Sequence, residues 1–588
     1  MNFPKDFIWG AATSSFQIEG ARRQDGGGPS IWEMFTAQPN KTWEGDGGEV
    51  ACDHYNRYEE DVECLAQIGV QAYRFSVSWP RIQPDGLGPP NKKGLDFYDR
   101  LVDRLLEKGV EPWITLYHWD MPYGLFLRGG WLNPDSPAWF ERYTTCVVKR
   151  LSDRVTKWMT INEPQGFIGL GYLSGEQAPG LKLGLRETLI AGHNSLLAHG
   201  RSVAAIREHA IAKPIIGWPT ACSVYQPITE TPENINAARK ASAAIYPDGV
   251  WNNRWWGDPV ILGHYPDEGL SVYGKAVPKI DPKDFEIICQ PLDFLGCNLF
   301  HGIHIKANDD GSPAAVKVEP GHPQSTYHWK TTPESIYWGT KFMSEFYRLP
   351  LIITENGYAD NDMVGFDGRV RDQNRIEFIS RYLIQLHRAI QEGIDIRGYF
   401  YWSLLDNFEW QEGYRQRFGL VHVDYQTQQR TMKDSAYWLH DIISTNGESL
   451  SQFKTNDNVQ VPYIIRETKR YIYNHIGEPF KIKEIADHLR CHPDFLSREF
   501  KRHMEVMLSS YIRQARIDHA KEMLKNPKTL IDDAAYQSGF SDRVHFTKVF
   551  RRLTGQTPGQ YQKQFREMDI KLLESGSLKV NNPRSTKE

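Results

Sequence analysis

Several features are missing from this chain of 588 residues, and each absence excludes a class of protein. The seven cysteines are odd in number and form no Cys-x-x-Cys pair, which argues against a disulfide framework and for reduced thiols. No apolar run reaches the length that spans a bilayer. The N-terminus has no basic segment followed by an apolar one, the pattern of a secretory signal. The sequence therefore predicts a cytoplasmic protein with no membrane partner.

Patterns of metal ligands are also lacking. His301 and His304 stand three residues apart, but no third ligand follows at a sensible spacing. We therefore predict no metal and no cofactor.

What the chain does have is an unequal distribution of charge. Residues 461–588 hold 24 Lys and Arg against 16 Asp and Glu, a net charge of +8, whereas the first 460 residues hold 45 against 57, a net charge of −12. Such a split indicates different partners for the two regions. The polar stretch 448–461 between them is interpreted as a linker, and residues 567–588 as a polar tail.

Eight short apolar runs of strand length recur in the first region and alternate with amphipathic helical stretches. Alternation of this kind predicts a parallel (β/α)8 barrel over residues 1–447, an α/β fold. The expected strands are Phe7–Gln17, Ala72–Trp79, Trp113–His118, Trp158–Glu163, Ile215–Thr220, Phe294–Asn298, Leu351–Glu355 and Ile396–Trp402.

Polar and aromatic side chains stand where these runs end. The carboxyl ends of barrel strands meet at one mouth, so we expect the side chains to converge there. Separated carboxylates, amides and Trp faces suit a neutral polyhydroxylated ring. Taken singly, His118, Trp402 and Trp410 are typical of core residues, but Glu409 beside Trp410 at a strand exit is hard to bury without a purpose.

Four motifs carry a resemblance to a known family. Phe7–Gly20, Thr160–Pro164, Thr354–Gly357 and Tyr401–Trp410 resemble family 1 glycoside hydrolases, in the family's order and over about residues 2–445. The resemblance implies a retaining β-glycosidase with two carboxyl groups about 5–5.5 Å apart. It makes Glu163 the acid/base and Glu355 the nucleophile, and we expect their surroundings to separate the two pKa values.

The same resemblance assigns supporting roles. Arg74 and Asn298 match positions that favour the ionised nucleophile, and Asn162 matches the residue that bonds the sugar 2-hydroxyl. Glu409 and Trp410 also argue against a 6-phosphoglycoside, because a phosphate there would face a carboxylate. The residues matching the glycone-binding set are Gln17, His118, Glu409 and Trp410, with Trp402 as the ring platform.

One position departs from the family pattern. After the sixth strand the family has Asn-x-Tyr, whose hydroxyl bonds the nucleophile, whereas this chain has Asn298-Leu299-Phe300. Loss of that donor removes a hydrogen bond to a charged acceptor, on the order of 1.5–3 kcal/mol. We expect slower or altered turnover rather than abolished catalysis.

The C-terminal region contains a partial repeat, residues 485–502 and 534–552. Each copy predicts a short helix, a tight turn and a second helix, with Gly539 in the second turn, Pro493 opening its helix and Ser541 as an N-cap. This is a helix-turn-helix arrangement, a small all-α domain. Residues 462–566 resemble the AraC-type DNA-binding domain, although Arg490 and Glu505 stand where that family usually has glycine.

The resemblance implies double-stranded DNA as the partner of residues 462–566, with the second helix of each unit in the major groove. Asp494, Ser497 and Arg498 share one face of the first helix, and Val544, Thr547 and Lys548 share one face of the second. We expect base or phosphate contacts from Ser497, Arg498, Arg543 and Lys548, and backbone contacts from Lys501, Arg551 and Arg552. The alternative is that the two helical hairpins dock on the barrel or on another protein, and the net charge of +8 argues against it.

Three functions compete. The favoured one is an active β-glycosidase carrying a DNA-binding regulator domain. The alternative is a sugar-sensing regulator whose barrel has weak or no catalysis, which Phe300 keeps open; the third is an enzyme with a vestigial appended domain. The sequence leaves open the glycone and aglycone preference, any coupling of sugar to DNA binding, the operator and the oligomeric state, a homodimer included.

Overall fold

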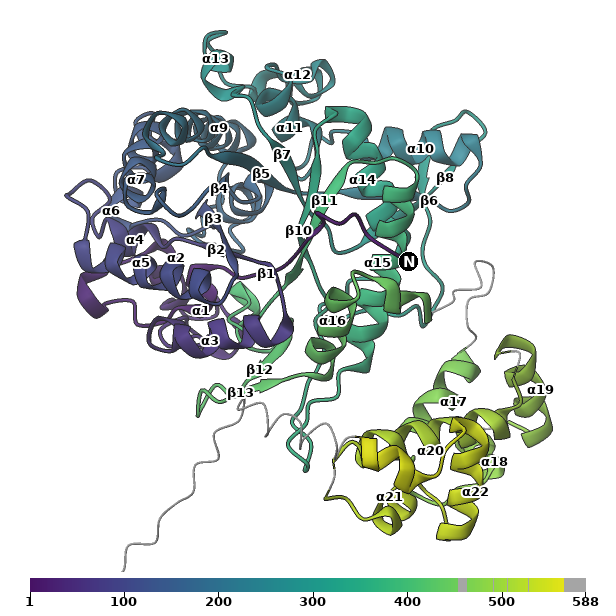
Figure 1. Ribbon diagram of the computed structural model, residues 1–588. Helices are drawn as coiled ribbons and strands as arrows, with labels where there is room; N and C mark the ends of the chain where they lie inside the picture. Colours follow the sequence, from purple (N-terminus) through teal and green to yellow (C-terminus); the bar gives the residue numbers. More distant parts are fainter. Residues whose placement is uncertain (453–462, 490, 505, 527, 565–588) are drawn as a thin grey trace, which may run out of the picture. The chain divides into compact units, whose positions relative to one another are not determined.

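The structure, a computed structural model, describes residues 1–452, 463–489, 491–504, 506–526 and 528–564. The chain separates into two compact units, residues 1–453 and 454–588 (Figure 1). Within the described ranges, no helix combines the length and the apolar character needed to cross a membrane.

The first unit is built on a closed barrel of eight parallel strands in the order β1-β11-β10-β7-β5-β4-β3-β2 (Figure 1). The predicted fold class is confirmed, and a barrel strand overlaps each of the eight predicted runs. Two runs were predicted too long: Phe7–Gln17 continues into the helix Ser15–Ile18, and Ala72–Trp79 reaches the helix that begins at Trp79. Residues after both strands are buried too, so apolar character does not mark where these strands end. The barrel strands are buried on both faces, which explains why they read as continuous apolar runs. They are β1 Ile8–Ala12, β2 Ala72–Ser76, β3 Glu111–Tyr117, β4 Lys157–Ile161, β5 Ile215–Ala221, β7 Phe294–Asn298, β10 Leu351–Asn356 and β11 Ile396–Trp402.

Helices surround the barrel, as the amphipathic stretches predict (Figure 1). In α5, for example, Phe97, Leu101 and Leu105 repeat every four residues and all three are buried. The long helices are α3 His54–Ile68, α5 Lys92–Glu107, α7 Ser136–Leu151, α9 Leu185–His209, α14 Glu334–Tyr347, α15 Gln373–Gln391 and α16 Asp434–Ser444.

Shorter elements lie in the connections. They include two small sheets, β6 Val224–Pro227 with β8 Gly302–Ala307 and β9 Pro313–Ala315, and β12 Val421–Val423 with β13 Arg430–Met432. The remaining α-helices of this unit are α1 Ser15–Ile18, α2 Ile31–Thr36, α4 Trp79–Ile82, α6 Tyr123–Phe126, α8 Pro164–Ile168, α10 Pro232–Ala243, α11 Arg254–Ile261, α12 Asp267–Tyr273 and α13 Asp284–Ile288.

The interior of the barrel is filled by side chains rather than open. Trp113 of β3 lies with its ring centroid 5.6 Å from that of Phe294 and 5.0 Å from that of Phe400. A plug of this kind closes the barrel and leaves the carboxyl ends of the strands as the place for a site. It consists of Ala12, Ala72, Trp113, Met159, Phe294, Ile352 and Phe400, with Trp402 in the same cluster.

The strand register aligns the residues that the sequence singles out. Glu355 of β10 pairs with Asn298 of β7, and a register shift separates Ile353 from Glu355 along β10. An irregularity of this kind re-aims the side chains that follow it. Ala12 of β1 pairs with Trp402, the last residue of β11.

In the described part of the second unit the regular elements are all helices: α17 Tyr463–Asn474, α18 Ile482–His488, α19 Pro493–Met504, α20 Leu508–Leu524, α21 Ile531–Gln537 and α22 Arg543–Thr554. One cluster of buried residues holds α17 to α19 against the first half of α20, and a second holds α21 and α22 against its other half. The unit therefore has two helix-turn-helix halves joined by α20, as the partial repeat predicts.

The details of the turns are mixed. Pro493 opens α19, and Gly539 has φ +75° in the second turn, as predicted. The prediction of Ser541 as N-cap is wrong: the cap is Asp542, whose carboxylate accepts from the His545 backbone N–H at 2.7 Å. Ser and Asp are both good caps, so composition alone did not choose between neighbours.

Part of the predicted linker belongs to the first unit, because a short helix spans Glu448–Gln452 and Leu450 is buried in the barrel core. Arg490, Glu505, the remainder of the predicted linker and the predicted tail 567–588 lie outside the described residues.

Candidate active site and nucleic-acid interface

Glu355 stands near the end of β10 against a buried arginine. Arg74 of β2 donates from Nη1 to Glu355 Oε1 at 2.6 Å and to the Thr354 carbonyl at 3.0 Å. Its other nitrogens donate to Asn162 Oδ1 at 2.6 Å and to Thr115 Oγ1 at 3.1 Å. Arg74 is thus fixed at every nitrogen and presents a positive charge to Glu355 in a water-poor setting.

Glu163 follows β4 and precedes Pro164, the first residue of α8. Its backbone is left-handed, with φ +44°. That conformation is strained for a residue with a Cβ, and such strain clusters at functional sites. The Asn298 amide donates to Glu163 Oε1 at 3.0 Å and to Asn162 Oδ1 at 3.1 Å. One hydrogen-bond network therefore runs from Glu355 through Arg74, Asn162 and Asn298 to Glu163.

The two carboxyl groups experience different surroundings. Burial raises the pKa of Glu163 to about 8, and the negative charge of Glu355 adds to the rise. Burial also raises the pKa of Glu355, but the charge and hydrogen bond of Arg74 oppose that rise. The shared proton of this pair therefore resides on Glu163, and Glu355 holds the negative charge.

A second group of predicted residues lies beside these carboxyl groups. Gln17 of α1 donates to Glu409 Oε2 at 3.0 Å and to Asn407 Oδ1 at 3.1 Å. The His118 ring lies nearly parallel to Trp402 and Trp410, with ring centroids 5.7 and 6.1 Å away. The nine predicted catalytic and sugar-binding residues, and Arg74, are all buried around one place.

His118 connects the two groups. The Asn162 amide nitrogen lies 3.2 Å from Nε2 of His118, and burial together with the charge of Arg74 lowers the pKa of the imidazole well below its ordinary value. The ring is therefore neutral. Nδ1 of His118 is buried and has no hydrogen-bond partner among the described residues, so it is available to a ligand hydroxyl.

The side of the site around Phe300 is aromatic. Phe300 lies 5.1 Å from Trp329 and 6.1 Å from Phe418, measured between ring centroids, and Tyr327 stacks on Trp329 at 4.4 Å. The Phe300 backbone carbonyl accepts from the Tyr382 hydroxyl at 2.8 Å. The ring is therefore held in place without the hydroxyl that a tyrosine would bring.

In the helical unit, the predicted contact residues lie at the surface. Arg498 and Lys548 are exposed, and Ser497 is half-buried. Arg543 is exposed and forms an ion pair with Asp532 of α21, with 3.3 Å between Nη1 and Oδ2. The guanidinium of Arg498 lies 5.9 Å from the ring of Phe495. These side chains share no buried network of the kind seen in the barrel.

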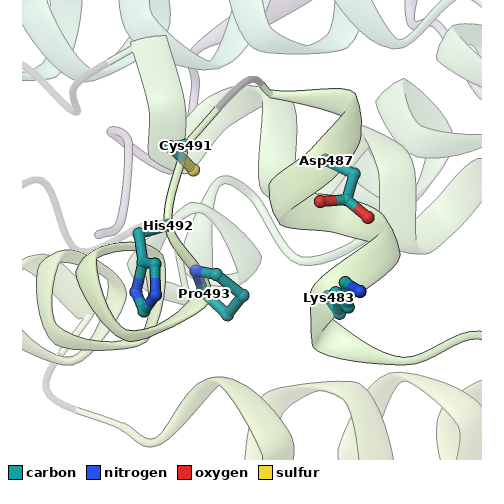
Figure 2. A pocket seen from close by; sticks show the side chains of 5 residues that line it. All are labelled: Lys483, Asp487, Cys491, His492 and Pro493. Atoms are coloured by element: carbon teal, nitrogen blue, oxygen red, sulfur yellow. The ribbon is translucent and has the colours of Figure 1, made fainter.

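An open hollow borders the first helix-turn-helix half (Figure 2). Lys483 and Asp487 of α18 line one side of it, and Cys491 and His492, which precede α19, line the other side with Pro493, the first residue of α19 (Figure 2). Among the described residues, no group of three or more His, Cys, Asp or Glu side chains is arranged to hold a metal ion.

Comparison with known proteins decides the family. The model of glycosyl hydrolase family 1 matches residues 1–448, and that of a helix-turn-helix domain matches residues 485–564. The chain belongs to glycosyl hydrolase family 1. It is a glycoside hydrolase of this family fused to an AraC-type helix-turn-helix domain, which confirms both resemblances seen in the sequence.

Relatives that match the family 1 part are named as glucosidases or glucan hydrolases. The chain is 45% identical to a 1,4-beta-D-glucan glucohydrolase of Thermotoga neapolitana over 76% of its own length and 99% of that protein. It is 41% identical to a beta-glucosidase of Agrobacterium sp. over 75% of its own length and 95% of that protein. A solved beta-glucosidase of Thermotoga maritima in complex with glucoimidazole is 43% identical, with a TM-score of 0.70 and coverage of 76% and 99%.

The family 1 site includes residues to which sequence analysis gave no role. Trp119 has φ +71°, stacks on Trp410 at 4.9 Å and donates from Nε1 to the Asn162 carbonyl at 3.1 Å. Thr354 donates to Asn298 Oδ1 at 2.6 Å and so orients its amide. Position beside His118 and Glu355 was the available signal, but neither residue type points to sugar chemistry by itself.

Proposed function

We propose that this family 1 glycoside hydrolase is a retaining β-glycosidase for non-phosphorylated β-glycosides, and that its helical unit binds DNA sequence-selectively. The observation that carries the first part is the unequal pair of carboxyl groups, with Arg74 on Glu355 and a pKa of about 8 for Glu163. The names of its relatives, beta-glucosidase and glucan glucohydrolase, agree with it.

In the proposed first step, ionised Glu355 attacks the anomeric carbon and the glycosidic bond breaks. Protonated Glu163 gives its proton to the leaving oxygen. A covalent glycosyl-enzyme remains, and Glu163 is now a carboxylate. In the second step Glu163 takes a proton from water, which attacks the anomeric carbon and releases Glu355.

The remaining groups bind the glycone. We assign Asn162 to the sugar 2-hydroxyl, and the contacts of its amide with Arg74, Asn298 and His118 support this by holding it in the network of the two carboxyl groups. Trp402 offers a ring face, and Gln17 and Glu409 offer hydrogen bonds to further hydroxyls. Burial raises the pKa of Glu409 to about 8, and the negative charge of Glu355 adds to the rise, so repulsion between Glu409 and a sugar phosphate grows as pH rises toward that value.

The enzymatic proposal is tested with purified protein and an aryl β-glucoside. We expect hydrolysis in which the first-formed sugar keeps the β-configuration, and NMR spectra recorded during the reaction measure this. An α-configured product would contradict the two-step mechanism, and no hydrolysis by the parent protein would overturn the enzymatic proposal.

The DNA-binding proposal rests on two helix-turn-helix halves with exposed basic residues and on the net charge of +8 over residues 461–588. Selection from random duplexes with the full chain should enrich a defined sequence. Binding that weakens with salt but shows no sequence preference would reduce the unit to a basic surface.

A sugar-sensing regulator with weak catalysis is the second candidate, favoured by Phe300. It predicts that a β-glycoside or free sugar changes DNA affinity while turnover stays slow. Titration of the selected duplex with and without sugar separates the two functions, because coupling must appear as a change in affinity.

A further inference from the structure

The two recognition helices can be compared position by position. Leu496 and Phe500 of α19 are fully buried, and so are Phe546 and Phe550 of α22, with the same spacing of four residues. Alignment on these buried pairs places Ser497 opposite Thr547, Arg498 opposite Lys548, and Asp494 opposite Val544. A hydroxyl side chain therefore matches a hydroxyl side chain, and a basic side chain matches a basic one. Only the third pair, Asp494 and Val544, differs in chemical character.

At this position α22 presents an aliphatic side chain to solvent. Val544 is 65% exposed, although Phe546, two residues later, is fully buried. It shares its face with Thr547 and Lys548, and Arg543 precedes it. Val544 is thus an apolar group among cationic and polar side chains that suit a polyanion. In the major groove of DNA, thymine offers an apolar partner, its C5-methyl group.

At the same position α19 presents a carboxylate. The side chain of Asp494 is 94% exposed, and its Oδ2 lies 3.6 Å from Nδ1 of His492. A negative charge on a face turned to DNA is repelled by phosphates unless a base donates to it. Among the bases, cytosine donates to Asp from its N4 amino group in the major groove.

We infer that the two recognition helices read different bases, with Val544 contacting a thymine methyl and Asp494 accepting from a cytosine amino group. The operator then consists of two unequal segments rather than two copies of one sequence. This inference rests on the proposed DNA-binding function and adds the chemistry of its specificity.

The test begins with the duplex selected by the full chain. Each thymine is replaced in turn by uracil, which removes only the C5-methyl, and affinity is measured by fluorescence anisotropy. We expect one replacement to weaken binding about fourfold, the effect of one methyl-sized group taken from water. In Val544→Ala, replacement of that same thymine by uracil should not change affinity, while replacement of the other thymines should have the same effect as in the parent protein.

Leu530→Ala is the matched control, because Leu530 is also aliphatic and 65% exposed but lies before α21, outside both recognition helices. It should leave affinity and the uracil profile unchanged. If Val544→Ala alters helical content, Val544→Ser, which carries no methyl group, replaces it.

For α19, Asp494→Ala should remove the preference for cytosine at one position of the operator segment that α19 contacts. A uracil profile identical in the parent and Val544→Ala, or two segments with the same preferred sequence, would overturn the inference while leaving sequence-selective binding intact. Binding without any sequence preference would instead remove the proposed function and this inference with it.

Discussion

The two units of this chain hold their functional groups in opposite ways. In the barrel, Arg74, Glu163, Glu355 and Glu409 are charged or ionisable groups with almost no contact with solvent. In the helical unit, Arg498, Arg543 and Lys548 stand at the surface. A buried charge requires hydrogen-bond or ion-pair partners, so the barrel site has a connected network. The exposed basic side chains are stabilised by solvent and need no such network before a ligand binds.

The difference decides which solution conditions act on each function. Low dielectric surroundings shift the pKa values of the buried carboxyl groups, so the barrel should respond to pH. The exposed cations are screened by salt, so the helical unit should respond to ionic strength. Substitutions that disturb one function and spare the other test this contrast.

The largest effect is expected for Glu355→Ala. Loss of the nucleophile should lower kcat for an aryl β-glucoside by a factor on the order of 10⁴ or more. Affinity for the selected duplex should not change. Asp395→Ala, which removes an exposed carboxylate paired with Arg397, is the matched control and should retain activity. Activity surviving in Glu355→Ala would exclude this residue as the nucleophile.

The next effect concerns pH. Glu163 with a pKa of about 8 is protonated below that pH and can act as an acid; above it the proton is lost and kcat/KM should fall as pH rises. In Glu163→Gln this alkaline limb should disappear, with a loss of about 10²–10⁴-fold for poor leaving groups. A parent profile without an alkaline limb near pH 8 would contradict the assignment.

On the DNA side, Arg543→Ala should weaken binding to the selected duplex by about five- to 150-fold if the guanidinium contacts a base, and it should relax selectivity at one position. Lys525→Ala removes one positive charge from the end of α20, outside both recognition helices, and serves as the control. Equal losses in both variants would mean that Arg543 contributes only charge. Hydrolysis of the glucoside should be unaffected in either.

The smallest effect is expected for Phe300→Tyr. A hydroxyl that donates to Glu355 should raise kcat up to about tenfold and move the acidic limb of the pH profile to lower pH, because the bond favours the ionised carboxylate. Steady-state kinetics across pH would measure both changes. An unaltered rate would mean that the contacts from Arg74 already suffice, or that the new hydroxyl turns elsewhere.

Much of the barrel could be predicted because its strands are buried on both faces and its functional side chains stand at strand ends. Position and motif alike pointed to Glu163, Asn298 and Glu355, and the structure joins these residues in one hydrogen-bond network. Trp119 was not given a role, since its importance lies in a left-handed backbone and a stack on Trp410, and neither is visible in residue type. The cap at Asp542 was missed by one residue for a similar reason, because Ser and Asp compete equally in sequence.

The left-handed backbone of Glu163 has a consequence for how such a fusion can evolve. A residue with a Cβ at φ +44° costs about 1–2 kcal/mol relative to glycine, and burial of its carboxyl group adds to that cost. Replacement of Glu163 by glycine would relieve that backbone cost and remove the proposed acid, while Gln17 and His118, the residues proposed to bind the sugar, would remain. A single nucleotide change in a glutamate codon can produce that glycine. If Glu163 has the role proposed for it, the enzyme is one substitution away from a receptor that binds its sugar without consuming it.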